Sequence, residues 1–174
     1  THSEIEFPNS IREKLEDHTI DKIYIVGQGT AAVAGQALSQ YLSEETEISV
    51  ESIPSTELSG FKLSTDMSNV LVVAISQSGT TTDTNRTVDL VRGRGASVIA
   101  IVNRRNSDLS QKADGVIYTS DGRDIEMSVA STKAFYSQVA ASILLGISIR
   151  DHAISEPNDS LTHENRQTFL HELN

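Results

Sequence analysis

The chain has 174 residues, of which 37% are hydrophobic and 22% are charged, and its formal net charge is −10. These values are typical of one folded globular domain and exclude a largely disordered chain. The acidic balance argues against nucleic acid as a partner, because no basic surface is available to replace phosphate counterions. The lack of cysteine excludes disulfides and thiolate metal sites, and it fits a cytoplasmic protein.

Neither end of the sequence resembles a membrane anchor or an export signal. No run approaches the ~18 apolar residues of a membrane span, and no basic-then-apolar segment opens the chain. We therefore expect no membrane partner. Because Thr1 stands where a translation start would carry methionine, we expect the chain to be a piece of a longer protein.

Apolar periodicity in the first third predicts a helix, a strand, a helix and a second strand. The first helix falls within residues 5–18, with Asn9 or Ser10 as its cap. The β-branched run "KIYIV", residues 22–26, is the first strand, and "GQGT" leads from it into an alanine-rich helix. "EISVESI", residues 47–53, is the second strand. "PSTELSGF" predicts a helical turn within a loop.

The remaining two thirds continue the alternation of strands and helices. Residues 69–75, "NVLVVAI", are apolar on both faces, which predicts a strand that is covered on both sides. There follow a helix at 83–94 stopped by Gly95, strands at 97–102 and 115–119, and a helix at about 133–145 that Gly146 ends. Residues 151–160 are polar and linker-like, and 161–173 predict a last, weakly amphipathic helix.

Strands separated by helices predict an α/β fold of three αβα layers around a five-stranded parallel sheet. Right-handed connections favour the strand order 2-1-3-4-5, in which the chain changes direction between the first and third strands. Ligands of open α/β sheets bind at this switch point, beyond the carboxyl ends of the strands. We therefore expect the loops "GQGTAA" and "SQSGTTT" to face each other across one crevice.

The second of these loops offers many small neutral hydrogen-bond donors. Ser76, Ser78 and residues 80–82 carry hydroxyls, and Gly79 allows the backbone to approach a ligand closely. Together with the free N–H groups of a helix start, such donors suit a phosphate monoester dianion. Helix capping and turn formation are the alternative explanation. No P-loop motif and no acidic cluster for Mg²⁺ is present, so we expect no metal and no cofactor.

The first loop supports a rival hypothesis. "GQGTAA" matches the G-x-G-x-x-A fingerprint of a dinucleotide site, directly after a strand and before a helix. Glu51, near the end of the second strand, stands about where such a fold places its ribose-binding acid. An NAD-binding Rossmann-type domain is therefore an alternative, although it leaves the hydroxyl-rich loop without a role.

A third segment, "EMSVASTKAF", precedes the helix at 133–145. Ser131 or Thr132 is a natural cap for this helix, and Lys133 falls in its first turn. A cation there opposes the helix dipole by about 0.3–1 kcal/mol. Residues that work against a local rule are often functional, although a single lysine usually extends into solvent.

Together "SQSGTTTDT" and "EMSVASTKAF" resemble the two signatures of the SIS (sugar isomerase) domain family. More narrowly, they resemble the isomerase half of glucosamine-6-phosphate synthase, the glutamine–fructose-6-phosphate aminotransferase. The resemblance runs from about Ile23 to Leu145. It implies a helical lead-in at 1–20, one flavodoxin-like SIS domain at 21–150 that holds a hexose 6-phosphate, and a linker with a C-terminal helix at 151–174.

The resemblance also implies which residues bind the substrate. They are Thr30 in the first loop, Ser76, Gln77, Ser78, Gly79 and Thr81 in the second, and Val129 and Ser131 in the third. The chain departs from the family pattern at Gln28 (commonly Cys), Ala31 (a ligand-contacting Ser) and Thr80 (Glu). The "DIEMSVAS" stretch is also about two residues longer. We therefore expect the phosphate contacts to be retained and leave the identity of the sugar open.

The catalytic residues are not identified by the sequence. In the resembled enzymes the base, the ring-opening His and a C-terminal Lys lie beyond the first SIS domain or in the neighbouring subunit. We expect the local candidates Glu126 and Glu51 to be ordinary solvated carboxylates. The five histidines fall outside the motif loops, and we expect them to be exposed.

We therefore expect the chain to be the sugar-binding lobe of a synthase-like isomerase or aminotransferase in amino-sugar metabolism. As the lobe of such an enzyme it would act as a homodimer or paired with a second SIS domain. A stand-alone SIS isomerase or phosphosugar sensor is the alternative.

Overall fold

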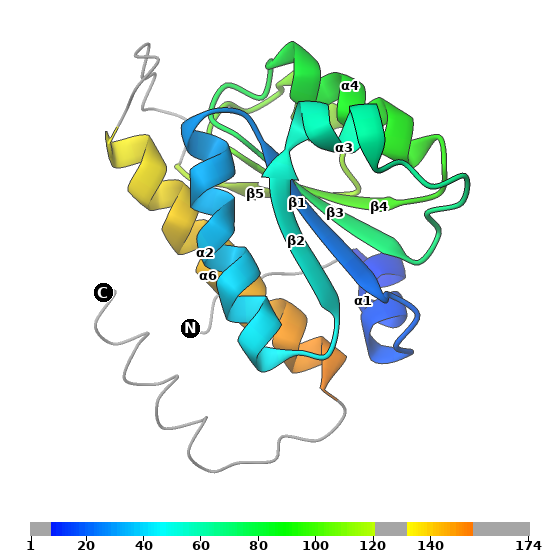
Figure 1. The fold of residues 1–174 in the computed structure, drawn as a ribbon. Helices are drawn as coiled ribbons and strands as arrows, with labels where there is room; N and C mark the ends of the chain where they lie inside the picture. The colour runs from blue at the N-terminus through cyan, green and yellow to red at the C-terminus, as the bar shows by residue number, and fades with distance from the viewer. Residues whose placement is uncertain (1–7, 121–131, 155–174) are drawn as a thin grey trace, which may run out of the picture.

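The computed structural model describes residues 8–120 and 132–154. One parallel sheet forms the middle layer, and helices form a layer on each of its faces (Figure 1). The strands are β1 (Lys22–Gly27), β2 (Ser49–Pro54), β3 (Val70–Ser76), β4 (Ser97–Val102) and β5 (Gly115–Tyr118). Their order is β2-β1-β3-β4-β5, and every neighbouring pair is parallel. The predicted fold class and strand order are therefore confirmed.

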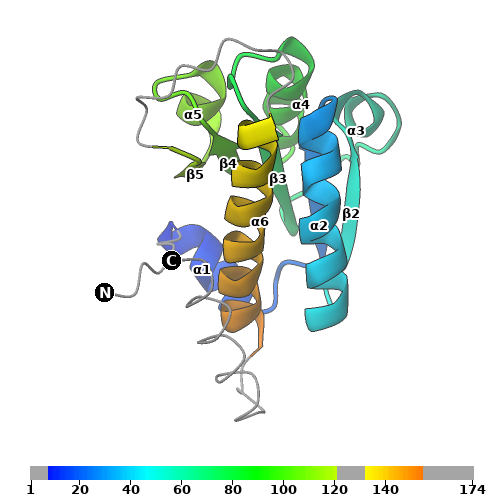
Figure 2. The ribbon, with the colours of Figure 1, turned by 90° about the vertical axis from the view of Figure 1, so that its left-hand side faces the viewer.

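The helices divide between the two faces of the sheet. They are α1 (Asn9–Glu16), α2 (Thr30–Glu45), α3 (Ser55–Phe61), α4 (Thr82–Arg92), α5 (Asp108–Lys112) and α6 (Thr132–Ala153). Figures 1 and 2 show α1, α2 and α6 on one side of the sheet and α3, α4 and α5 on the other. Each side encloses its own apolar core. No described helix combines the length and apolar character needed to cross a membrane.

β3 is the central strand, and all seven of its residues are buried. Because side chains of a strand alternate between its two faces, Leu71, Val73 and Ile75 fill one core while Val72 and Ala74 fill the other. This arrangement confirms the prediction, made from the unbroken apolar run, that the strand is covered on both sides.

Gly146 does not end the last helix, contrary to the prediction from the sequence. α6 continues through it to Ala153, so residues 151–153, predicted as the start of a linker, are helical. A Cβ atom built on Gly146 would lie 2.7 Å from Cδ1 of Tyr41 and 2.9 Å from Cδ1 of Leu38. The glycine therefore provides room for α2 to pack closely against α6, and Ile149, fully buried beyond it, favours continuation of the helix.

The structure also differs from the predictions in four local details. α3 is a helix of seven residues rather than a turn, and α4 ends at Arg92, before Gly93. α5 was not predicted, because its five residues are too few to show periodicity. Oγ of Ser107 caps this helix by accepting a hydrogen bond from the Ser110 N–H. Pro8, rather than Asn9 or Ser10, precedes α1. The helix predicted at 161–173 lies outside the described residues.

Replacement of Gly146 by alanine should destabilise the protein by about 1–3 kcal/mol, because the added methyl overpacks the contact between α2 and α6. Gly60 in α3 is a matched control, since a Cβ there meets no atom within 4 Å. Gly60→Ala should stabilise the protein by up to about 1 kcal/mol. Urea unfolding of both variants checks the pair, and equal effects would contradict this account of α6.

Candidate functional site

Two polar loops leave neighbouring strands at the same edge of the sheet. Val26 of β1 pairs with Ala74 of β3, so the segments that follow these strands, residues 28–29 and 77–81, begin side by side. α2 starts after the first segment and α4 after the second, on opposite faces of the sheet (Figure 1). The predicted switch point is therefore present, with two helix N-termini at it.

The first loop is a tight turn that ends in an exposed threonine. Gly29 has φ +60°, a conformation that glycine adopts without strain, and it precedes α2. A Cβ on Gly27 would lie 2.9 Å from the backbone carbon of Ala31, so the strand and the helix start are in close contact. Thr30 is exposed at the first position of α2. Its position agrees with the predicted location, while its contact with a ligand stays a prediction.

In the second loop, the hydroxyl-rich loop (residues 76–81), serine oxygens accept backbone hydrogen bonds. The Gly79 N–H donates to Oγ of Ser76 over 3.1 Å, and the Thr80 N–H donates to Oγ of Ser78 over 3.2 Å. The hydroxyls of Ser76 and Thr81 lie 3.3 Å apart. A serine oxygen that accepts in this way keeps its own hydrogen to donate to another acceptor. The loop can therefore direct O–H donors at an anion.

Burial distinguishes the predicted residues of this loop. Ser76 is only 3% exposed, and its hydroxyl supports the loop by accepting from the Gly79 N–H. Gln77, Ser78 and Thr81 are half-buried, and Thr80 is exposed. The structure thus brings these side chains together at one edge, and their roles in binding stay predictions.

The loop between β4 and α5, which follows the strand next to β3, contacts the hydroxyl-rich loop and supports it. The N–H groups of Asn103 and Arg104 donate to the carbonyl of Gln77 over 3.2 and 3.4 Å. Gly79 has φ +65°, and a Cβ there would lie 2.1 Å from Oγ of Ser107. Only glycine therefore fits between the two loops without a shift of the backbone.

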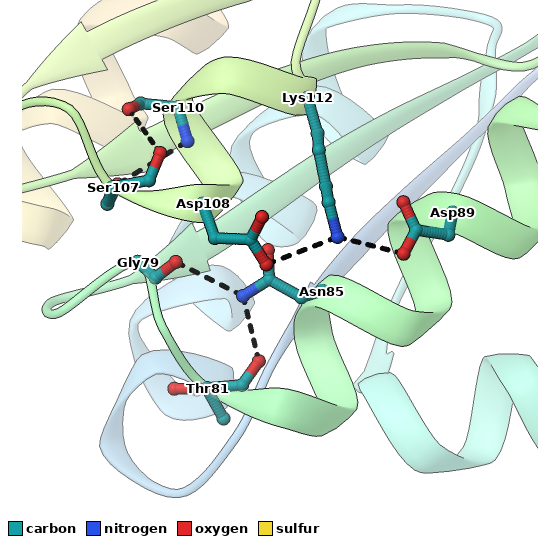
Figure 3. Close-up of polar contacts among 8 residues, drawn as sticks. All are labelled: Gly79, Thr81, Asn85, Asp89, Ser107, Asp108, Ser110 and Lys112. Carbon is teal, nitrogen blue, oxygen red and sulfur yellow. Dashed lines mark hydrogen bonds and ion pairs between the residues drawn. The ribbon is translucent and has the colours of Figure 1, made fainter.

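Asn85 is a member of the site that the sequence did not reveal. Its side chain comes from α4 and donates hydrogen bonds to two carbonyls of the hydroxyl-rich loop (Figure 3). Ser107 was missed as well. Neither residue belongs to a motif. The only sequence signal for Asn85 was a polar residue on the buried face of a helix, and Ser107 precedes a helix too short to be predicted.

The third predicted loop lies outside the described residues, and so do Val129, Ser131 and the candidate base Glu126. Lys133 lies exposed in the first turn of α6, as predicted. Among the described residues no group of three His, Asp or Glu side chains could hold a metal ion.

The part of the chain that the structure describes contains two of the five histidines, His18 and His152. His18 is exposed as expected, while His152, near the end of α6, is half-buried, with Nδ1 3.0 Å from Oε1 of Glu16.

Glu51 does not occupy the position of a ribose-binding acid. It lies within β2, opposite Tyr24 in the register, with three residues of the strand still to follow. Its carboxylate forms ion pairs with Nζ of Lys62 and, over 3.4 Å, with Nζ of Lys22. The hydrogen bond from Lys62 lowers the pKa of Glu51 below its usual value, against the opposing effect of burial, and Lys22 lowers it further. The carboxylate is thus engaged within the protein, which weakens the NAD hypothesis.

The ion pairs of Glu51 should make stability depend on pH. Because the pKa of Glu51 is lower in the folded chain, its contribution is complete above the ordinary value of 4.5 and is lost as pH falls through the lowered folded value. Glu51→Gln should therefore show a smaller loss of unfolding free energy between pH 7 and pH 3 than the parent. Exposed Glu13, which has no ion pair among the described residues, is the control. Denaturant unfolding over the pH series measures both, and parallel curves for parent and Glu51→Gln would contradict the assignment.

These features define an α/β domain of the flavodoxin-like type with a hydroxyl-rich loop at its switch point. Residues 18–148 match the model of one family, described as the SIS domain. The chain belongs to the SIS domain family.

Curated relatives extend this assignment. The chain is 44% identical over 131 residues to glutamine–fructose-6-phosphate aminotransferase (isomerizing) of Corynebacterium glutamicum, covering 74% of this chain and 20% of the relative. It is 37% identical over 148 residues to the enzyme of the same name from Mycobacterium leprae, covering 85% and 23%. The chain is homologous to the isomerase domain of that enzyme and spans about a fifth of the relatives' length.

Solved structures share the fold. The C-terminal domain of glucosamine-fructose-6-phosphate aminotransferase from Francisella tularensis superposes with a TM-score of 0.78 at 24% identity, covering 96% of this chain and 46% of that one. The Vibrio vulnificus NanR protein, solved in complex with ManNAc-6P, has a TM-score of 0.68 at 20% identity and covers 95% and 60%. Both likenesses concern the fold.

Proposed function

We propose that the chain is the phosphosugar-binding lobe of a glucosamine-6-phosphate synthase-like isomerase or aminotransferase, and that it binds a hexose 6-phosphate in amino-sugar metabolism. The observation that carries the proposal is the hydroxyl-rich loop at the switch point of a SIS domain. Its "SQSGTTTDT" signature follows a fully buried strand and opens an eleven-residue helix. NanR, of the same fold, was solved with an amino-sugar phosphate, which agrees with the proposed ligand class.

The loop can hold a phosphate without a basic residue. The hydroxyls of Ser78 and Thr81 supply donors, and the N-terminus of α4 adds unpaired backbone N–H groups and the positive end of its dipole. Thr30, from the first loop, would contact the same phosphate, and Val129 and Ser131 would line the sugar. Because the loop offers neutral donors and no Lys or Arg, a single phosphate monoester suits it better than a triphosphate, whose greater charge is usually met by Lys or Mg²⁺.

The proposed lobe binds the sugar without completing the reaction. Aldose–ketose isomerisation requires a base that moves a proton between C1 and C2 and a group that opens the ring. We propose that these groups come from a second SIS domain or a second copy of the chain. Val33 and Tyr136, near the N-terminal ends of the packed helices α2 and α6, are 51% and 66% exposed and offer apolar surface for such pairing. A cytoplasmic location stays a prediction.

Calorimetric titration with fructose 6-phosphate, glucosamine 6-phosphate and NAD tests the proposal. We expect the two hexose phosphates to bind in competition with each other, and NAD not to bind. Turnover of fructose 6-phosphate by the isolated chain would instead favour the alternative, a stand-alone SIS isomerase. Binding of NAD without competition from hexose phosphates would contradict the proposal.

Ser78→Ala should weaken hexose 6-phosphate binding by about 10–100-fold, because a hydrogen bond to a charged group contributes about 1.5–3 kcal/mol. The fold should be unaffected, since the Thr80 N–H that Ser78 accepts is exposed and can bind water instead. Ser43→Ala, at an exposed position of α2, is the matched control and should leave affinity unchanged. Calorimetry and thermal unfolding measure the pair, and unaltered affinity of Ser78→Ala would remove the residue from the site.

A further inference from the structure

Asn85 connects the helix α4 to the backbone of the hydroxyl-rich loop. The side chain is 5% exposed. Its Nδ2 donates to the Gly79 carbonyl over 3.1 Å and to the Thr81 carbonyl over 3.0 Å (Figure 3). One amide group thus holds two carbonyls that lie on either side of Thr80.

These two hydrogen bonds are not needed to satisfy the carbonyls. The Gly79 carbonyl also accepts from the Leu109 N–H over 3.0 Å, and the Thr81 carbonyl accepts from the backbone N–H of Asn85 over 3.0 Å. Either oxygen would therefore keep a partner if the side-chain amide were absent. The need to pair these buried carbonyls therefore does not explain why asparagine occupies position 85.

The amide oxygen of Asn85 makes the residue costly for folding. Oδ1 is buried and has no hydrogen-bond partner among the residues that the structure describes. A buried acceptor without a partner costs folding free energy, whereas an apolar side chain of similar shape would avoid that cost. A residue that breaks a local rule of stability beside a candidate ligand loop indicates a role in function.

The geometry of the peptide bond shows how the side-chain amide of Asn85 orients the backbone N–H groups of the loop. The carbonyl of Gly79 and the N–H of Thr80 belong to one planar trans peptide and point in opposite directions. The same holds for the carbonyl of Thr81 and the N–H of Thr82, the first residue of α4. By drawing both carbonyls toward α4, Asn85 directs the two N–H groups away from the helix. The Thr80 N–H donates to Oγ of Ser78, so the orientation of that hydroxyl is fixed as well.

We propose that Asn85 is a positioning residue for phosphate binding: its side-chain amide aligns the donors of residues 78–82 before a phosphate monoester arrives. The inference rests on the proposed function and deepens it, because it assigns the alignment of the site to a residue that does not touch the ligand. Alignment in advance removes the cost of ordering the loop during binding. Without the amide, the loop should still form, but it should sample orientations in which its donors do not converge.

Asn85→Leu is the first test, because leucine resembles asparagine in shape and supplies no donor. We expect the melting temperature to stay level or rise, and the affinity for fructose 6-phosphate to fall by about tenfold or more. Thr87→Val is the matched control on the same helix. Thr87 is fully buried and its Oγ1 donates to the carbonyls of Ser55 and Asp83, away from the loop. This variant should lose stability and keep its affinity.

Asn85→Asp provides a readout that a purely structural role would not give. An ionised carboxylate would face two carbonyl oxygens and repel them, whereas a protonated carboxyl can donate to one of the two. The affinity of Asn85→Asp relative to the parent should therefore recover as pH falls from 8 to 5. Comparison with the parent at each pH cancels the titration of the phosphate itself.

The outcomes separate the two proposals. If the parent binds fructose 6-phosphate and Asn85→Leu binds it equally, the positioning role is overturned and the proposed function stands. A parallel loss of stability and affinity in Asn85→Leu, with no pH recovery in Asn85→Asp, would also overturn it. If Asn85→Leu does not fold, the pH series of Asn85→Asp decides. If the parent binds no hexose phosphate, both proposals fail.

Discussion

The parallel pairing of β3 with both β1 and β4 is the constraint on which the rest of the structure depends. Because all three strands point the same way, the segments that follow them emerge at one edge of the sheet. The pairing also buries β3 on both faces, which requires helices on both sides and places α2 and α4 with their N-termini at that edge. Layering and site location thus have one physical origin.

The candidate site is built from neutral groups, and its donors therefore depend on the surrounding structure for their alignment. A loop of hydroxyls and backbone N–H groups provides no strong charge, so its donors must be aligned by neighbouring structure. Two elements contribute to that alignment, the loop after β4 and the helix α4. The loop after β4 contacts the Gln77 carbonyl, Ser107 packs against Gly79, and Asn85 reaches the loop from α4. The surrounding residues, more than the motif itself, determine the geometry offered to a phosphate.

The chain spans about a fifth of its curated relatives, whose isomerase domain it matches. In the proposed function, the chain supplies the loops that bind the substrate, and the proton-transfer groups come from elsewhere. Its edge carries donors suited to an anion, while Glu51 is engaged by lysines and His152 lies at the far end of α6.

The sequence by itself determined the strand order, the two cores and the position of the polar loops, because periodicity and unbroken apolar runs report burial directly. It also determined the family, through two motifs that few other folds share. Only the tertiary structure decided that Gly146 lies inside a helix, since the close approach of Tyr41 and Leu38 is a long-range contact. It alone assigned Asn85 to the site, because a side chain's partners depend on which loop the fold brings to it.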